Sequence, residues 1–422
     1  MKMQKKRGIG RRTVAQAILG GMMLATMTVL PFTAASAETL VINTDRSGAG
    51  QKAAMNKIAA DFEAANPGVT VNINYSDVES YKTSIRNFLV ASPPDVAFWF
   101  TGARMRAFTQ RDLFEDLTPF FEENKLKEPM APFIDAVSDG GKQYMMPTNF
   151  NIWGFFYNKA VFEKASLQPP KTWDELMQAS AKLKESGVVP FAIGTRDLWA
   201  NALWFDFLTK RTAGLEFYME LMNGKAAYTD DRIKHVFEIW KDPIDKGYFL
   251  ENASSYGWQE AIPFLNQGKA GMYLLGPYVL TSLPEEARGN MGFFPFPKVD
   301  ASVPDYEQVS INGVGIPKGA KNKELAKKFL AFLAEPAQLN AFAKGGQVVP
   351  ARVDAELDPK DFASVQLELV RSSAGSSQFY DRDTNPDMAQ EGMKGFQEFL
   401  ARPDRAEAIL DRLEGTRKRV FK

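Results

Sequence analysis

The sequence has no cysteine among its 422 residues and only one histidine. Disulfide bonds are therefore excluded, and a zinc or other transition-metal site would lack thiolates and have at most one imidazole. His235 lies in the helical segment RIKHVF, where a lone histidine is more often structural or exposed than catalytic. Phosphate-binding motifs of the GxxxxGK[ST] and GxGxxG types are also missing. We expect no catalytic residue, no metal and no cofactor.

Long hydrophobic runs are scarce as well. The main one, residues 14–30, is short and glycine-containing for a membrane span. Basic residues precede it, and Ala35-Ser36-Ala37 follows as a small-residue cleavage site. This arrangement predicts a signal peptide over residues 1–37, cleaved after Ala37, and export of a soluble protein to the periplasm. Arg11-Arg12 leaves a twin-arginine route open beside the general secretory route.

An excess of positive charge is missing from the rest of the chain. Residues 1–37 hold six basic and no acidic residues, so the remainder has 45 basic against 51 acidic residues. Nucleic acids and anionic membranes require a basic surface, and we expect neither as a partner. The remaining length exceeds the ~250 to 300 residues at which chains usually divide into domains. Two domains are therefore expected.

The N-terminal third shows alternating strand and helix patterns. Strands are predicted over residues 39–44, 69–75 and 95–100, with helical periodicity between them. This order is typical of a parallel α/β sheet with right-handed crossovers. Because ligands of such sheets gather where strands run into loops, residues 45–50 and 101–104 are candidate ligand loops.

Further elements follow a change in composition after Met146-Pro147. Thr172 and Glu175 are spaced as a capping box that begins a helix. A strand is predicted over 188–193, a glycine-punctuated strand over 312–317, and an amphipathic helix over 323–333 with Leu325, Phe329 and Phe332 facing inward.

The stretch NFNIWGFFYN, residues 149–158, places five aromatic rings among three asparagines. A buried strand is one interpretation, since aromatic residues favour strands. The other is a site for a small hydroxyl-rich molecule such as a sugar, because rings offer flat apolar faces and amides offer paired donors and acceptors. Both interpretations stay open at this point, and a second domain is expected to begin with this stretch. The direction of Trp153 stays open.

Aromatic residues elsewhere also stand beside polar planar groups or turns. Each ring alone is better explained by core packing, but their association with loops favours a binding role for the group. The set consists of Trp99, Trp199, Trp258, Tyr278 and Tyr380.

Five fragments, in this order, resemble the extracellular solute-binding proteins of carbohydrate ABC importers, the family that includes maltose-binding protein. They are DFEAANPGVTVN (61–72), PPDVAFWF (93–100), YMMPTNFNIWGFFYNKAVFEKASLQPPKTWDEL (144–176), FLNQGKAGMYLLGPY (264–278) and INGVGIPKGAKNKELAKKFLAFLAEP (311–336). The resemblance covers nearly all of the chain after residue 37.

The resemblance implies an α/β two-lobe periplasmic binding protein fold, with hinge crossovers and a cleft between the lobes. The N-terminal lobe would comprise 38–147 plus 312–350, and the C-terminal lobe 148–311 plus 351–422. Crossings between them are expected near 147–149, 308–312 and 350–354. In such a fold NFNIWGFFYN would be the first strand that enters the second lobe, with Asn149 and Asn151 reaching the cleft and Phe155 and Phe156 supplying its wall and core. We assign Asn151 to ligand contact and keep Phe156 in the core.

The expected ligand-binding residues have two sources. Positions carried over from the family are Asp45, Arg46, Ser47, Trp99, Asn151, Gly276, Tyr278 and Tyr380. Positions proposed from their loops, rings or charge are Thr101, Arg104, Asn149, Trp199, Trp258, Arg352 and Arg382. Maltose-binding protein has an Asp-Arg pair where this chain has Thr101-Gly102-Ala103-Arg104, which argues against maltose. The glutamate expected at the returning strand is Asn151 here, so one hydroxyl partner differs.

The implied function is capture of a carbohydrate (a mono- or oligosaccharide, or a sugar derivative) by hinge closure, and its delivery to the membrane permease subunits of an ABC importer. The protein is expected to act as a monomer. One alternative is a binder of a non-sugar or anionic polar solute, because Arg46, Arg104, Arg352 and Arg382 supply positive charge. A second is a secreted glycosidase, which would require paired carboxylates in a cleft.

Overall fold

The computed structural model describes residues 38–422, and the predicted signal peptide and its cleavage site lie outside the described residues. The described residues belong to one compact unit. None of the described helices has the length and apolar character needed to cross a membrane. The strands are β1 Glu38–Thr44, β2 Val69–Tyr75, β3 Val96–Phe100, β4 Ser138–Asp139, β5 Lys142–Gln143, β6 Met146–Ile152, β7 Gly154–Asn158, β8 Val189–Ala192, β9 Ala270–Leu275, β10 Met291–Phe294, β11 Glu307–Gly315, β12 Val349–Pro350 and β13 Ser376–Ser377.

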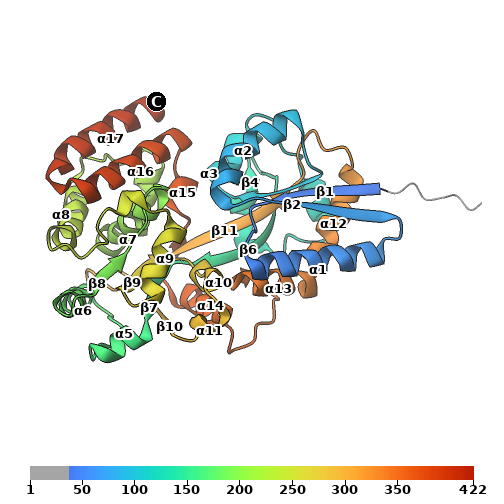
Figure 1. Ribbon diagram of the computed structural model, residues 1–422. Coiled ribbons are helices and arrows are strands. Elements are labelled where there is room, and N and C mark those ends of the chain that lie inside the picture. Colours follow the sequence, from blue (N-terminus) through green and yellow to red (C-terminus); the bar gives the residue numbers. More distant parts are fainter. Residues whose placement is uncertain (1–37) are drawn as a thin grey trace, which may run out of the picture. The chain divides into compact units, whose positions relative to one another are not determined.

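Helices account for more of the described chain than strands do (Figure 1). They are α1 Ala49–Ala65, α2 Val78–Ala91, α3 Ala103–Thr109, α4 Thr118–Glu123, α5 Lys159–Lys164, α6 Trp173–Glu185, α7 Trp199–Met222, α8 Asp231–Asp245, α9 Trp258–Asn266, α10 Tyr278–Ser282, α11 Glu285–Arg288, α12 Lys323–Ala334, α13 Pro336–Gly346, α14 Phe362–Ser372, α15 Tyr380–Asp383, α16 Pro386–Ala401 and α17 Ala406–Val420, with short 3-10 turns at η1 Ala131–Phe133, η2 Asp135–Val137, η3 Ala253–Ser255 and η4 Pro403–Arg405.

The larger sheet has the strand order β12-β6-β11-β3-β1-β2, with β13 paired to β11. As predicted, β1 pairs in parallel with both β2 and β3. The sheet as a whole is mixed, because β11 runs antiparallel to β3 and to β6. The register of β11 against β6 shifts between Asn312 and Gly313.

A second, four-stranded sheet has the order β10-β7-β9-β8. Each sheet has its own hydrophobic core. The first core gathers buried residues of β1, β3, α1, α2, α12 and α13 around the larger sheet, including Ile42, Phe62 and Phe98. The second core surrounds the smaller sheet and α7, α8, α16 and α17, and includes Phe155, Trp204 and Phe396. Figure 1 shows α13 beside α1 in the first group of elements.

The stretch NFNIWGFFYN is not the single strand that the sequence predicts. Its first part belongs to β6 in the larger sheet, and its second part is β7 in the smaller sheet. Trp153 lies between them, and its backbone N–H donates to the carbonyl of Gln308. Phe155 and Phe156 are both fully buried in the second core. The aromatic run therefore carries the chain from one sheet to the other.

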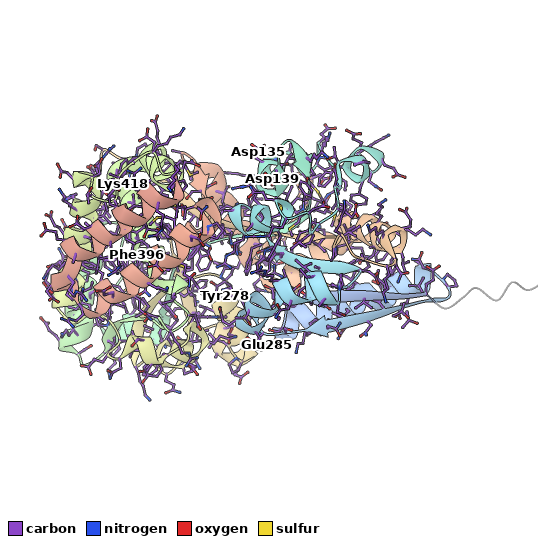
Figure 2. The ribbon with its side chains drawn as sticks, turned by 90° about the horizontal axis from the view of Figure 1, so that it is seen from above. Asp135, Asp139, Tyr278, Glu285, Phe396 and Lys418 are labelled. Atoms are coloured by element: carbon purple, nitrogen blue, oxygen red, sulfur yellow. The ribbon has the colours of Figure 1, made fainter. Side chains whose placement is uncertain are left out.

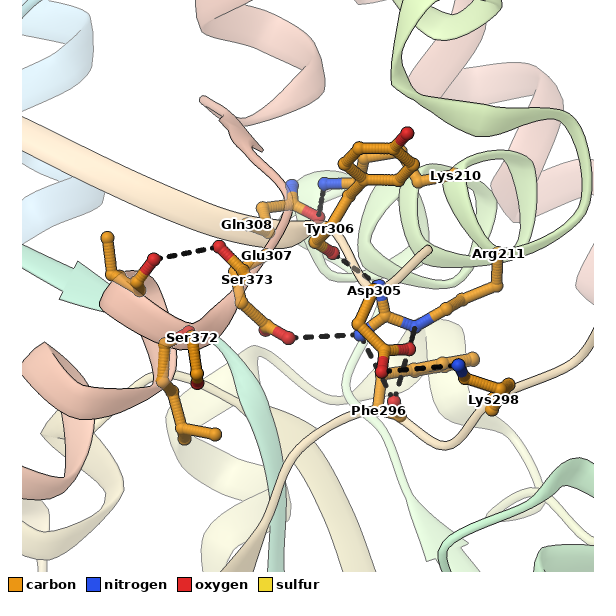
Figure 3. Close-up of polar contacts among 12 residues, drawn as sticks. Lys210, Arg211, Phe296, Lys298, Asp305, Tyr306, Glu307, Gln308, Ser372 and Ser373 are labelled. Atoms are coloured by element: carbon orange, nitrogen blue, oxygen red, sulfur yellow. Dashed lines mark hydrogen bonds and ion pairs between the residues drawn. The ribbon is translucent and has the colours of Figure 1, made fainter. Parts of the chain in front are cut away.

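Strand β11 packs in the first core through Val314 near its end, while its first residues are held by two cations of α7 from the second core (Figure 3). The guanidinium of Arg211 donates to the carboxylate of Glu307 at 3.0 Å and to the carbonyl of Phe296. The ammonium of Lys210 donates to Gln308 at 3.3 Å and to the Ser377 hydroxyl at 3.0 Å. The start of β11 is thereby fixed against the second core.

Local sequence signals account for several of these elements. The predicted capping box of α6 is confirmed, with the Thr172 hydroxyl accepting from the Glu175 N–H and the Glu175 carboxylate accepting from the Thr172 N–H. In α12, Leu325 and Phe329 are buried as predicted, while Phe332 is only partly buried against the first core.

Candidate ligand-binding site

A cavity lies where the loop after β1 and the helix α2 meet residues of α7, α9, α10 and α15. About 140 Å³ of it can hold the centres of water-sized molecules. An apolar cavity of about 150 Å³ takes up a benzene molecule, so this space is large enough for a ligand of about one ring. Strands β6 and β11 form its floor through Asn149, Asn151, Ser310 and Asn312. Figure 2 shows Tyr278, a lining residue, beside the N-terminal segments.

Nine of the fifteen predicted site residues line this cavity. They are Asp45, Arg46, Ser47, Asn149, Asn151, Trp199, Trp258, Tyr278 and Arg382. The indole of Trp153, whose direction the sequence left open, also lines it. Lining residues that the sequence did not indicate include Lys82, Phe379 and Asp381.

Several buried polar atoms of the lining have no hydrogen-bond partner among the described residues. Both carboxylate oxygens of Asp45 are in this state, as are Nε and Nη2 of Arg46, Nε1 of Trp153 and Oδ1 of Asn312. The Asp45 side chain is only 1% exposed, and its Oδ1 lies 3.4 Å from Nε of Arg46. Buried polar groups are almost always hydrogen-bonded, because an unmet one costs about 1 to 3 kcal/mol. Because this set contains both acceptor oxygens and donor nitrogens, it indicates a ligand that can donate and accept hydrogen bonds.

The turn after β1 explains how Asp45 and Arg46 come to the cavity. Strand β1 ends at Thr44, whose hydroxyl accepts from the Arg46 N–H at 3.1 Å. The Ser47 N–H then bonds to the carbonyl of Asp45 at 2.9 Å, which tightens the turn before α1. The acidic and basic side chains therefore leave the carboxyl end of a parallel strand, where ligands of α/β sheets gather.

Four aromatic rings form one wall of the cavity. Trp153 packs edge-on against Trp199 and Tyr278, with ring centroids 5.7 Å and 5.4 Å away. Trp258 packs against Tyr278 at 4.9 Å and Trp199 at 5.9 Å. Burial raises the pKa of the Tyr278 hydroxyl well above its ordinary value, so this group keeps its proton at neutral pH. Flat ring faces next to unmet polar atoms suit the apolar and polar sides of a sugar ring.

Two further charged groups of the lining, Asp381 and Lys82, are compensated by residues beside the cavity. The Asp381 carboxylate accepts from Nε of Arg104 at 2.8 Å, and the Lys82 ammonium donates to Glu79 at 2.9 Å. Burial opposes ionisation of Asp381, but the nearby Arg104, Arg382 and Lys82 outweigh it and lower its pKa. Burial lowers the pKa of Arg382 to about 10, so its guanidinium stays charged at neutral pH.

Three predicted residues lie away from the cavity, which corrects their expected place in the cleft. Trp99 packs in the first core against Phe100 at 4.8 Å, because all five residues of β3 are buried. The Tyr380 ring is fully buried in the second core, and its hydroxyl bonds to that of Tyr228. Arg352 pairs with Asp354 at 2.7 Å and donates to a backbone carbonyl.

Three others lie behind lining residues without lining the cavity themselves. The Thr101 hydroxyl bonds to the carbonyl of Ile311 at 2.9 Å, and Arg104 pairs with Asp381. A Cβ at Gly276 would come within 2.6 Å of the Tyr278 ring and 3.3 Å of Nδ2 of Asn151. These positions support the wall and do not form its surface.

Comparison with known proteins gives three findings. A family model described as bacterial extracellular solute-binding protein matches residues 47–339. A protein of Pyrococcus horikoshii, named as an uncharacterised ABC transporter extracellular-binding protein, is 26% identical over 384 residues, which cover 86% of this chain and 85% of that protein. A solved bacterial solute receptor, described as having an exclusive preference for β-D-galactopyranose, matches with a TM-score of 0.86 at 25% identity, over 92% of this chain and 100% of the receptor.

A maltose-bound protein of T. maritima matches with a TM-score of 0.75 at 18% identity, over 90% of this chain and 99% of that one. At that identity the likeness concerns the fold alone. Together with the solute receptor, it confirms the predicted two-lobe α/β fold.

Proposed function

Because the chain belongs to the bacterial extracellular solute-binding protein family, we propose that it is the carbohydrate-binding component of an ABC importer. The resemblance drawn from the sequence is confirmed by that membership. Proteins of this kind bind and deliver solutes and are not enzymes, which removes the glycosidase alternative.

One observation carries the carbohydrate proposal. The cavity combines a wall of four rings with buried donors and acceptors that have no partner among residues 38–422. The Asp45 carboxylate can accept hydrogen bonds, and the Arg46 guanidinium and the Trp153 indole can donate them. Sugar hydroxyls both donate and accept hydrogen bonds, so they match this set of groups. The preference of the similar solute receptor for β-D-galactopyranose supports the same ligand class.

The ligand is proposed to bind between two lobes that close around it. We assign 38–147 plus 312–350 to one lobe and 148–311 plus 351–422 to the other, with β6, β11 and the segment at 350–354 as crossings. A ligand shifts the open and closed populations only by its preference for one of them. The closed protein would then dock, as a monomer, on the permease subunits. The proposed location is the periplasm, after cleavage behind Ala37.

A second candidate is an anionic sugar derivative. Three cations of the lining, Arg46, Lys82 and Arg382, stand against two carboxylates, Asp45 and Asp381. A carboxylated or sulfonated sugar would add the missing negative charge.

A thermal-shift screen of the protein from Glu38 onward tests both candidates. The panel holds D-galactose, D-glucose, L-arabinose, D-xylose, maltose, D-galacturonate, a sulfonated hexose and L-glutamate. A bound compound at 100 times its dissociation constant adds about 2.7 kcal/mol of stability, which is a shift of a few degrees. A shift with a neutral sugar, recovered unchanged, supports the carbohydrate proposal, and a shift only with the charged sugars supports the second candidate. A shift with L-glutamate alone contradicts both.

A further inference from the structure

Two polar contacts join the walls of the cavity across the two cores. The first links Arg104, on α3 beside Met105 of the first core, to Asp381, on α15 beside Tyr380 of the second core. The second links Glu79, on α2, to the indole of Trp199 at the start of α7. Each contact thus joins elements that belong to different cores.

The contact between Arg104 and Asp381 is an ion pair with both partners largely shielded from water. The Arg104 side chain is 24% exposed and that of Asp381 is 7% exposed. Both Nε and Nη2 of Arg104 donate to Oδ2 of the carboxylate. Removing one member of a shielded pair leaves the other charge poorly compensated, which costs more than loss of an exposed surface pair.

The contact between Glu79 and Trp199 combines a hydrogen bond with a cation–π interaction. The indole Nε1 of Trp199 donates to the Glu79 carboxylate at 3.2 Å. The same carboxylate binds the ammonium of Lys82, which stands 5.5 Å from the centre of the Trp199 ring. Glu79 therefore holds two groups of the cavity wall together, one from each core.

Neither Glu79 nor Arg104 lines the cavity, whereas Lys82, Trp199 and Asp381 do. We propose that Glu79 and Arg104 are positioning residues that hold the cleft closed over a bound sugar, without touching it. This inference rests on the proposed function. Since their contacts span the two cores, separation of the lobes must break them, and they therefore favour the closed state alone. Their loss should speed dissociation while association changes little.

The test uses the full chain from Glu38 and the panel sugar that shifts the wild-type protein most. For Arg104→Gln and Glu79→Ala we expect dissociation about tenfold faster in stopped-flow fluorescence, with association within about twofold of wild type. Arg104→Lys, which keeps the charge, should recover part of the loss. The ranking of panel sugars and the melting temperature without sugar should stay unchanged.

Two substitutions serve as matched controls. Glu324→Ala removes a first-turn glutamate of α12 that pairs with Lys327, as Glu79 pairs with Lys82 in α2. Unlike Glu79, it has no side-chain contact to the other core among the described residues. Arg232→Gln breaks an ion pair with Asp230 on the surface of the second core. Both controls should dissociate at the wild-type rate.

Spin labels give a readout of closure itself, because the chain has no cysteine of its own. With labels at Ala53→Cys on α1 and Glu286→Cys on α11, the sugar should shorten the distance in wild type and leave a longer-distance population in the Arg104 and Glu79 variants. Unchanged dissociation and distances, or a fall in the sugar-free melting temperature that matches the loss of affinity, would overturn the inference. If no panel sugar shifts the wild-type protein, the proposed function itself fails.

Discussion

Gly102 lies directly against the backbone of Arg382. A Cβ at position 102 would stand 2.5 Å from the carbonyl oxygen of Arg382 and 2.8 Å from Nε2 of Gln378. Its φ of 70° is also a value that residues with side chains rarely adopt. Since Gly102 caps α3 and Arg382 belongs to α15, this contact brings the two elements that carry Arg104 and Asp381 together.

We expect Gly102→Ala to weaken sugar binding about tenfold, because the added methyl prevents α3 and α15 from meeting, and to cost about 1 kcal/mol of stability through the positive φ. Calorimetric titration and thermal melting measure the two effects. Gly187→Ala is the matched control, with φ of 79° and open space around its Cβ. Equal losses of affinity in the two variants would argue against a steric role for Gly102.

Replacement of Asp45 should move stability and affinity differently. Asp45→Asn keeps the shape but removes a buried carboxylate whose oxygens have no hydrogen-bond partner among the described residues. Stability without ligand should stay equal or rise, whereas affinity should fall by roughly ten- to a hundredfold, since a charged acceptor is lost. Chemical denaturation and titration check both.

Asp95→Asn is the matched control for Asp45, because the Asp95 carboxylate is also buried but accepts from the N–H groups of Val41 and Asn322. This variant should lose stability and keep its affinity. An Asp45→Asn variant that binds as tightly as wild type would remove that residue from the site.

Substitution of Trp99 should mainly affect stability, whereas substitution of Tyr278 should mainly affect sugar binding. Trp99→Ala is expected to cost about 3 to 5 kcal/mol of stability, because it empties a space in the first core. Tyr278→Ala should weaken sugar binding more than it lowers stability, because the ring lines the cavity and is only partly buried. Urea unfolding and titration of each variant test this contrast, and the reverse pattern would contradict the assignment of the cavity.

The positions of strands and helix caps could be predicted well from the sequence. The direction in which individual side chains point could be predicted less well. Strands β1, β2 and β3 and the capping box of α6 follow from short-range patterns and lie within a residue or two of their predicted bounds. Strand β11, in contrast, begins five residues before its predicted start, because its first part is tied to α7 by contacts far apart in the sequence.

The site shows the same limit. Tyr380 and Asp381 are neighbours in a single turn of helix, yet one ring points into the second core and the next side chain reaches the cavity. Which of these two neighbouring residues faces the cavity depends on the tertiary packing of α15, and the local sequence does not determine it. Lys82 had no local signal, since its role depends on Trp199 from a distant segment.

The ion pair between Arg211 and Glu307 anchors the start of β11, and both side chains are nearly inaccessible (Figure 3). Arg211→Gln should lower stability by about 3 to 5 kcal/mol, since the Glu307 carboxylate would be left buried without its cation. Urea unfolding measures this change. The control Arg232→Gln, at an exposed pair, should change stability by less than about 1 kcal/mol. A loss no larger than the control's would show that β11 is held by other contacts.

Asp383 should make stability fall as pH rises. Burial raises the pKa of its carboxyl to about 7, although Lys210 and Arg106 act against this, and its Oδ2 has no hydrogen-bond partner within residues 38–422. Because the folded-state pKa exceeds the unfolded value of about 3.9, the fold favours the protonated form. The stabilisation is complete below about pH 4 and is lost as pH rises to about 7.

Asp383→Asn, which cannot ionise, should remove this loss, so its stability relative to wild type should increase by the order of 1 to 3 kcal/mol over that range. Urea unfolding of both proteins across this range gives the difference directly, and a difference that does not change with pH would show that Asp383 ionises in the fold as readily as in the unfolded chain.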